Sequence, residues 1–249
     1  MKKKIIILTL LFLVLVIVFA PVRLAENFIP ESNDLSISGM QGSIWSGRID
    51  LLEIKDWALK NIDYDLSVFA LLSGTIGGSA KINKGDIKGD LSFGIADQNS
   101  IAISDGNIEI SALNFERYLP FPGIELNGKF LTNELSAQLV DKKPIIMTGE
   151  TSWKGASVSI AAKKYELGNF QIIWDTDLEK KLITGTIKKN QKNKLDMDGK
   201  INITNNGMFE FNGSIAASSE KAIYSAFSLF ANGKVQNGRL PIQFKKKIF

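Results

Sequence analysis

Carboxylates are the residues of this chain best suited to acid–base chemistry. Three pairs stand two residues apart: Asp63 with Asp65, Asp175 with Asp177, and Asp196 with Asp198. On a β-strand this spacing places both side chains of a pair on one face of the sheet. A glycosidase needs two carboxylates that converge on the bond from different parts of the fold. Pairs on a single strand are more simply interpreted as the solvated face of a half-buried sheet.

The side chains that most often carry reactions are missing. The 249 residues include no His and no Cys, which removes the commonest general base near neutral pH, thiolate chemistry and disulfides. The chain also lacks a G-x-S-x-G nucleophile elbow, a phosphate-binding P-loop and an EF-hand pattern. We therefore predict that the protein is not an enzyme and holds no cofactor and no metal.

The positive net charge of +4 is concentrated at the N-terminus. Removing Lys2, Lys3 and Lys4 from the 30 basic residues leaves 27, against 26 acidic ones. A nearly neutral body has no general attraction for phosphates, so we predict no binding to nucleic acid. A second basic cluster, Lys245 to Lys247, is interpreted as a solvated charged tail, with a contact site as the alternative.

A run of 16 uncharged residues, 5–20, follows the N-terminal lysines, and Thr9 is its one polar member. With Pro21 and Val22 the run approaches the roughly 17–20 residues that cross a bilayer of about 30 Å. The lysines before it predict a cytoplasmic N-terminus. We therefore predict a cytoplasmic tip and a single transmembrane helix over 1–22, a juxtamembrane linker over 23–33, and a periplasmic β domain over 34–249.

The competing interpretation of the N-terminus is a cleaved signal peptide. Val18 and Ala20 suit the small-residue positions of a cleavage site, but Pro21 would follow the cut and obstruct the peptidase. The uncleaved anchor is therefore favoured, and the predicted location is a bacterial inner membrane with the C-terminal domain in the periplasm.

Apolar residues beyond position 33 mostly alternate with polar ones, as in Ile101 to Ser104 and Leu240 to Phe244. This alternation indicates strands with one face on a core and one in water. Asn-Gly and Asp-Gly dipeptides favour tight hairpin turns. They occur at 105–106, 127–128, 198–199, 206–207, 212–213, 232–233 and 237–238. Of these, 212–213 lies within an alternating run and predicts a bulge or a glycine kink.

The predicted fold is therefore mainly β: a long antiparallel, strongly curved meander sheet with one short helix, preceded by the single N-terminal transmembrane helix. The helix is predicted over Ser218 to Ala231, where apolar residues recur at helical spacing and would pack on the sheet. A further helical turn is predicted within Leu113 to Pro122, which ends at a proline.

The stretch LSISGMQGSIWSGR, residues 35–48, resembles a segment of the type II secretion system protein N family, L-x-G-x-x-G-T-x-W-x-G. The matching positions are Gly39, Gly42, Ser43, Trp45 and Gly47, with Ser43 where the family usually has Thr. Around Trp153 the chain resembles the family's middle region, and residues 206–241 resemble its end. The resemblance covers most of residues 5–244.

The resemblance implies an accessory inner-membrane subunit of a type II secretion system, without catalytic residues, in export of folded periplasmic proteins across the outer membrane. Implied partners are other components of the apparatus (inner-membrane platform, pseudopilus or secretin) and inner-membrane lipid. The sheet would meet them through an edge or a concave face. The glycines and tryptophans at these positions are predicted to be structural, and a partner contact is the alternative for Trp45.

Two other functions compete with this interpretation. Proteins of the AsmA-like family build curved β-sheets with an apolar inner face, and the same alternation would form a groove that binds or transports lipid. An inner face filled by side chains would remove that path. An anchored periplasmic hydrolase is the weakest alternative, because of the missing His and Cys.

Overall fold

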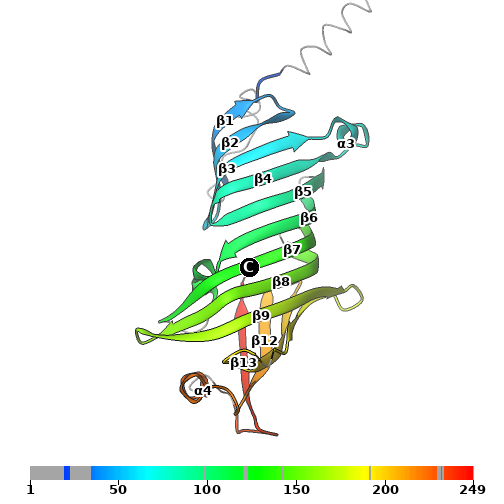
Figure 1. The fold of residues 1–249 in the computed structure, drawn as a ribbon. Coiled ribbons are helices and arrows are strands. Elements are labelled where there is room, and N and C mark those ends of the chain that lie inside the picture. Colours follow the sequence, from blue (N-terminus) through cyan, green and yellow to red (C-terminus); the bar gives the residue numbers. More distant parts are fainter. Residues whose placement is uncertain are drawn as a thin grey trace, which may run out of the picture. The chain divides into compact units, whose positions relative to one another are not determined.

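The computed structural model describes residues 20–22, 35–97, 99–119, 123–141, 143–190, 192–228, 231 and 233–248. In this part the chain is mainly β, as predicted, with strands that follow one another as antiparallel neighbours (Figure 1). Its internal contacts divide it into two compact units, Met1–Ala96 (unit 1) and Asp97–Phe249 (unit 2). The predicted linker over 23–33 lies outside the described residues.

Within the described ranges, none of the helices has the length and apolar character needed to span a membrane. The predicted cytoplasmic tip and transmembrane helix over 1–22 lie outside these ranges except for residues 20–22.

Unit 1 contains a meander of five antiparallel strands. These are β1 (Leu35–Gly42), β2 (Ser46–Ile54), β3 (Trp57–Leu66), β4 (Ile76–Gly85) and β5 (Ile87–Asp97). A five-residue helix, α3 (Val68–Leu72), connects β3 to β4 and was not predicted. Two small apolar clusters hold the unit together, one around Leu59, Ile62 and Ile82 and the other around Met40 and Tyr64.

Unit 2 contains eight further strands in the described residues. Its elements are β6 (Ser100–Ser111), the 3₁₀ helix η1 (Ala112–Tyr118), β7 (Ile124–Val140), β8 (Lys143–Ile160), β9 (Lys163–Asp177), β10 (Leu182–Lys188), β11 (Met197–Thr204), β12 (Met208–Ala216), α4 (Lys221–Ser228) and β13 (Arg239–Lys247). Figure 1 shows β12 and β13 running steeply across the direction of β7 to β9. The predicted helix at 218–231 and the helical turn at 113–122 are thus confirmed as α4 and η1.

One apolar core fills the inward face of unit 2. It draws buried side chains from η1, from every strand between β7 and β13, and from Ile223 of α4. Leu167, Leu195, Ile215 and Ile223 are among its fully buried members. Since α4 contributes Ile223 and Ala226 to buried positions, the helix packs on the sheet as its apolar spacing predicted.

The curvature of unit 2 comes from bulges in its long strands. The pairing of β7 with β8 shifts register between Asn127 and Lys129, and that of β8 with β9 shifts between Trp153 and Ala156. Gly128 lies at the first shift with φ +101°, a backbone conformation that L side chains rarely adopt. The prediction of a turn at 127–128 is therefore wrong, because the same dipeptide serves as a bulge inside β7.

The other dipeptides divide in the same way. Residues 206–207 and 237–238 form turns, as predicted, whereas 105–106 and 198–199 lie inside β6 and β11 and those turn predictions are wrong. Residues 212–213, where a bulge or kink was predicted, lie within β12, and the pairing register there is continuous. A side chain on Gly213 would meet the ring of Phe211. Close packing between strands accounts for the glycine there.

The end of the final strand contacts η1 in unit 2 through Lys246. The Nζ of Lys246 donates to the carbonyl oxygens of Arg117, at 2.9 Å, and of Leu119, at 3.3 Å. Lys245 forms an ion pair with Glu210 at 2.9 Å. The interpretation of Lys245 to Lys247 as a solvated tail is therefore wrong, because these residues belong to β13 and two of them make specific contacts.

Candidate functional site

The glycine- and tryptophan-containing segment picked out by the sequence forms the β1–β2 hairpin of unit 1. Ser43, Ile44 and Trp45 make the turn, and Gly42 pairs with Gly47 at its base. The Oγ of Ser43 accepts hydrogen bonds from the backbone N–H groups of Trp45 and Ser46, at 3.2 and 3.1 Å. The hydroxyl at position 43 therefore stabilises the turn, and a Thr there would offer the same group.

The glycines of this hairpin are required by the backbone. Gly42 has φ +97°, and a Cβ there would lie 2.7 Å from the carbonyl oxygen of Ser46. A Cβ on Gly47 would lie 2.2 Å from the carbonyl oxygen of Gln41. The two glycines therefore permit a tight turn between β1 and β2, which agrees with a structural role for them. Gly39 lies in β1 opposite Asp50.

Tyr64, which the sequence did not single out, supports the hairpin from β3. Its hydroxyl donates to the carbonyl oxygen of Ser43 at 2.7 Å, and its side chain is buried with Met40 and Val22. Burial raises the pKa of Tyr64, so the hydroxyl stays protonated and remains a donor.

Residues 20–22, the last residues of the predicted anchor, join the same end of the unit 1 sheet. The N–H of Ile44 donates to the carbonyl of Ala20 at 3.0 Å, and the N–H of Val22 donates to Gly42 at 3.1 Å. Pro21 forms an isolated β-bridge with Ser43. The chain therefore enters unit 1 beside the β1–β2 turn.

Trp153 occupies a packing position in β8 of unit 2. Its ring stacks on Phe130 with a centroid distance of 5.3 Å and lies 5.8 Å from Phe170. The indole Nε1 donates to the carbonyl of Asn127 at 2.9 Å. The expectation that this tryptophan acts as a core anchor agrees with these contacts.

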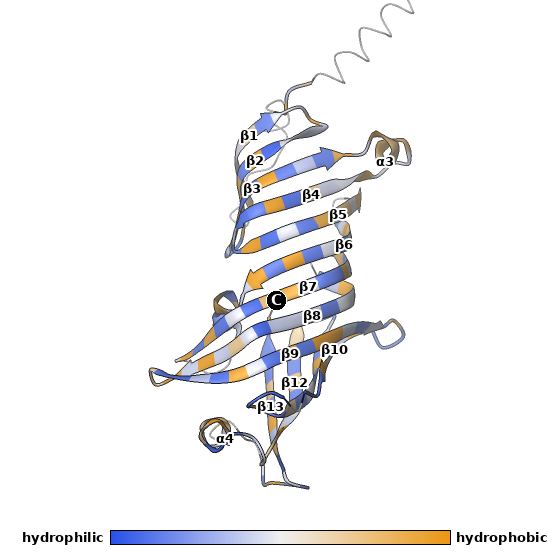
Figure 2. Ribbon diagram, in the orientation of Figure 1, coloured by the Kyte–Doolittle hydropathy of each residue, from blue (hydrophilic) through white to orange (hydrophobic). Residues whose placement is uncertain are grey.

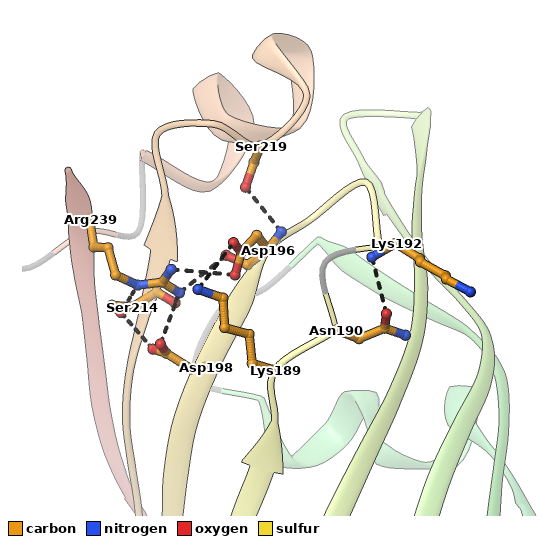
Figure 3. Close-up of polar contacts among 8 residues, drawn as sticks. All are labelled: Lys189, Asn190, Lys192, Asp196, Asp198, Ser214, Ser219 and Arg239. Carbon is orange, nitrogen blue, oxygen red and sulfur yellow. Dashed lines mark hydrogen bonds and ion pairs between the residues drawn. The ribbon is translucent and has the colours of Figure 1, made fainter.

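The densest polar cluster gathers around Arg239, the first residue of β13 (Figure 3). Its Nε donates to Ser214 Oγ at 2.7 Å, its Nη1 lies 3.3 Å from Asp196 Oδ1, and its Nη2 lies 3.1 Å from Asp198 Oδ2. Ser214 in turn donates to Asp198 at 2.6 Å. The cluster therefore ties β11, β12 and β13 together through one guanidinium group.

The rim of this cluster continues along the chain on either side. Lys189 lies 3.8 Å from the second oxygen of Asp196, and the Asp196 N–H donates to Ser219 Oγ just before α4. Beyond Lys189, the N–H of Lys192 donates to Asn190 Oδ1 at 3.0 Å (Figure 3). The side chain of Asp196 is only 17% exposed, so the interpretation of this pair as a solvated face is wrong for Asp196.

The two other carboxylate pairs agree with the solvated-face interpretation and also form ion pairs. Arg48 binds Asp63 at 2.7 Å and, with Asn83, lowers the pKa of Asp63. Lys180 binds Asp177 at 2.7 Å and lowers its pKa through that hydrogen bond. Both carboxyl groups are therefore held ionised, so neither is adapted to donate a proton near neutral pH.

A shallow depression of about 370 Å³ lies in unit 2 between the start of β9 and α4. It mixes both signs of charge, with Lys163, Lys164 and Lys194 beside Glu166 and Glu220. Lys194 already pairs with Glu166 at 3.2 Å. In the described ranges no three acidic, His or Cys residues come together as a metal site would require.

Strand β1 is the one edge of the unit 1 sheet that carries no charge. Its sequence LSISGMQG contains no Lys, Arg, Asp, Glu or Pro, and Ser36 and Ser38 are exposed. In the described residues β1 pairs with β2 and meets the chain again only at its end, where Val22 binds Gly42. Edge strands are usually protected from pairing with other chains by charges, proline or bulges.

Fold and site together define a β-meander scaffold, in which glycines shape the turns and bulges and charged side chains pair with one another. The family model of type II secretion system protein N matches residues 33–243. The chain therefore belongs to the type II secretion system protein N family, as its sequence suggested. No curated protein and no solved structure matches the chain.

Proposed function

We propose that this protein is an accessory inner-membrane subunit of a type II secretion system, with a structural, non-catalytic role in the export of folded periplasmic proteins. Membership of the family supports a role in this apparatus and interaction with its other components. The proposed location follows from the N-terminal lysines and the apolar run over 5–20, which would place the N-terminus in the cytoplasm and the β units in the periplasm.

The observation that carries the interaction role is the uncharged edge of β1. A strand whose outer N–H and C=O groups face away from its own sheet can accept a strand of a partner by β-augmentation. Tyr64 and the Gly42–Gly47 pair hold the adjoining turn in place, so the edge is presented in a fixed conformation. The partner would be the inner-membrane platform, the pseudopilus or the secretin.

The packing of unit 2 speaks against the lipid-groove alternative for that unit. Its inward face is occupied by a continuous core to which α4 contributes Ile223, and β13 closes onto η1. A lipid acyl chain would have to displace these buried side chains. The same core would make unit 2 rigid, which suits a structural role.

The proposal is tested by secretion in the parent bacterium. Deletion of the gene is expected to leave folded cargo in the periplasm, and the unaltered gene to restore its release into the medium. The edge is tested with Ser38→Lys, because a charge on an exposed edge residue opposes strand addition.

Ser79→Lys is the matched control, since Ser79 is exposed on β4 but β4 is paired on both sides with β3 and β5. Immunoblots verify equal amounts of each variant. We expect Ser38→Lys to lose secretion and Ser79→Lys to retain it. Normal secretion after deletion would refute the functional proposal, whereas equal secretion by the two lysine variants would refute only the role of β1.

A further inference from the structure

Helix α3 presents large apolar side chains to solvent at one end of unit 1. Phe69 is 83% and Leu72 81% exposed, and Val68, Leu71 and Ile76 are exposed as well. We call these five residues the apolar tip. No residue of α3 is buried, and Figure 2 shows the helix coloured as hydrophobic where it projects beyond β3 and β4. Adjacent exposed apolar side chains of this size mark a contact surface.

The polar groups of this turn are satisfied by its own residues. Ser67 Oγ accepts from the Ala70 N–H at 3.3 Å and caps the start of α3. The carbonyl of Ala70 accepts from Ser73 Oγ at 2.7 Å and from Thr75 Oγ1 at 3.0 Å. Residues 66–80 include no charged side chain. The apolar tip can therefore leave water without burying a charge, and the polar groups of its turn remain hydrogen-bonded.

The apolar tip lies at the end of the sheet where the chain enters from the predicted anchor. Ile44 binds the carbonyl of Ala20, the last residue of the apolar run, and the N–H of Leu66 donates to the neighbouring carbonyl of Trp45. Leu66 is followed directly by Ser67, the cap of α3. Two hydrogen bonds and a few residues thus connect the end of the apolar run with the tip.

We infer that the apolar tip inserts into the periplasmic leaflet of the same bilayer that the proposed N-terminal anchor crosses. Apolar side chains on a short, capped turn enter the interface between headgroups and acyl chains. Because residue 20 is held next to this end of the sheet, the tip is already close to the lipid, which raises its effective concentration there. Unit 1 would then be fixed to the membrane at two points. This inference rests on the proposed anchor for its orientation.

Lipid contact can be measured on the full chain, because a chain without Cys accepts single labelling sites. Phe69→Cys and Leu72→Cys are labelled with the fluorophore NBD and reconstituted in vesicles of phosphatidylethanolamine and phosphatidylglycerol. Parallel vesicles carry brominated acyl chains, which quench a label that enters the leaflet. We expect both labels to lose most of their emission and to shift it to shorter wavelength.

Ile54→Cys is the matched control, since Ile54 is an exposed apolar residue at the opposite end of β2. Its label is expected to keep its emission in brominated vesicles. Equal quenching at 54 and 72, or none at 69 and 72, would overturn the inference. A blue shift at 72 without quenching would also overturn it and would indicate that the apolar tip packs against protein, either its own chain or a second copy.

A label at Val14→Cys reports the anchor separately. Quenching at 14 without quenching at 72 would leave the proposed location intact and reject insertion of the tip. Quenching at 72 without quenching at 14 would support the tip as a lipid contact and reject the anchor. Absence of quenching at both 14 and 72 would reject the membrane placement as a whole. The secretion test of β1 does not depend on this result.

Discussion

The hydroxyl of Tyr64 in β3 donates a hydrogen bond of 2.7 Å to the carbonyl oxygen of Ser43 in the β1–β2 turn. This bond joins the third strand of unit 1 to the turn beside which the chain enters from residue 20. Since Tyr64 is 9% exposed, water does not readily replace the donor. A hydrogen bond from β3, a strand that is not adjacent to the turn in sequence, therefore stabilises the turn.

Tyr64→Phe is expected to destabilise unit 1 by about 1 kcal/mol, because it leaves the Ser43 carbonyl without this donor. Urea unfolding followed by tryptophan fluorescence measures the change. Hydrogen exchange should quicken at Leu66, whose N–H binds Trp45 in the same turn. Tyr165→Phe, a change of the same kind in unit 2, should leave exchange at Leu66 unaltered; equal effects of both changes on Leu66 would contradict the assignment.

Arg239→Met should cost more, about 2–3 kcal/mol, because it removes hydrogen bonds to charged groups and leaves the mostly buried Asp196 without its main cation. Thermal or urea denaturation measures the loss. The exposed pair of Arg48 and Asp63 provides the contrast, since Arg48→Met should change stability little. A double-mutant cycle with Asp196→Asn should show a coupling of about 1–2 kcal/mol. Additive effects would mean that Arg239 contributes through packing alone.

The amino-acid sequence was sufficient to predict the type of fold and some of its turns. Alternation with period 2 predicts strands, and helical spacing predicts α4. The meander, α4 and the turns at 206–207 and 237–238 therefore follow from local sequence patterns. Asn127-Gly128 was misassigned because positive φ serves a hairpin turn and a β-bulge equally well. Only the register of the neighbouring strand distinguishes the two.

The candidate site was harder to predict because its contacts join residues far apart in the chain. Charge patterns identified the Asp196/Asp198 pair, but nothing local indicates that the guanidinium of Arg239, some 40 residues later in β13, would reach both carboxylates across β12. Lys246 likewise looks like a solvated charge in sequence, whereas its partners are backbone carbonyls that no residue type reveals. Segment 42–47 could be singled out because its glycines and tryptophan lie within six residues, but its turn was not predicted.

Lys246→Met is expected to loosen the closure of β13 onto η1. The change keeps the aliphatic stem but removes the donor to the carbonyls of Arg117 and Leu119, at a cost of about 1 kcal/mol. Limited proteolysis within 112–119 should accelerate, and the thermal midpoint should fall. Lys247→Met is the control, because Lys247 is exposed on the same strand. If both variants are cleaved at the parent rate, Lys246 does not hold η1.

Glu210 and Lys245 provide a pH-dependent contact between β12 and β13. The hydrogen bond from Lys245, and a second from Asn212, lower the pKa of Glu210 from its ordinary value of 4.5. A carboxyl group with a lowered pKa in the folded state stabilises that state above its unfolded pKa. This contribution is lost as the pH falls from about 4.5 through the folded-state pKa, where Glu210 becomes protonated.

Lys245→Met should therefore raise the pKa of Glu210 toward its ordinary value, as followed by NMR titration of the side-chain carboxyl carbon. The same variant should flatten the acid limb of the stability profile, because Glu210 then titrates at nearly the same pH in the folded and unfolded chains. Lys247→Met, two residues farther along the same face of β13, should leave the titration of Glu210 in place. An unchanged Glu210 pKa in Lys245→Met would show that Asn212 alone sets it, and that the charge on Lys245 does not bind β13 to β12.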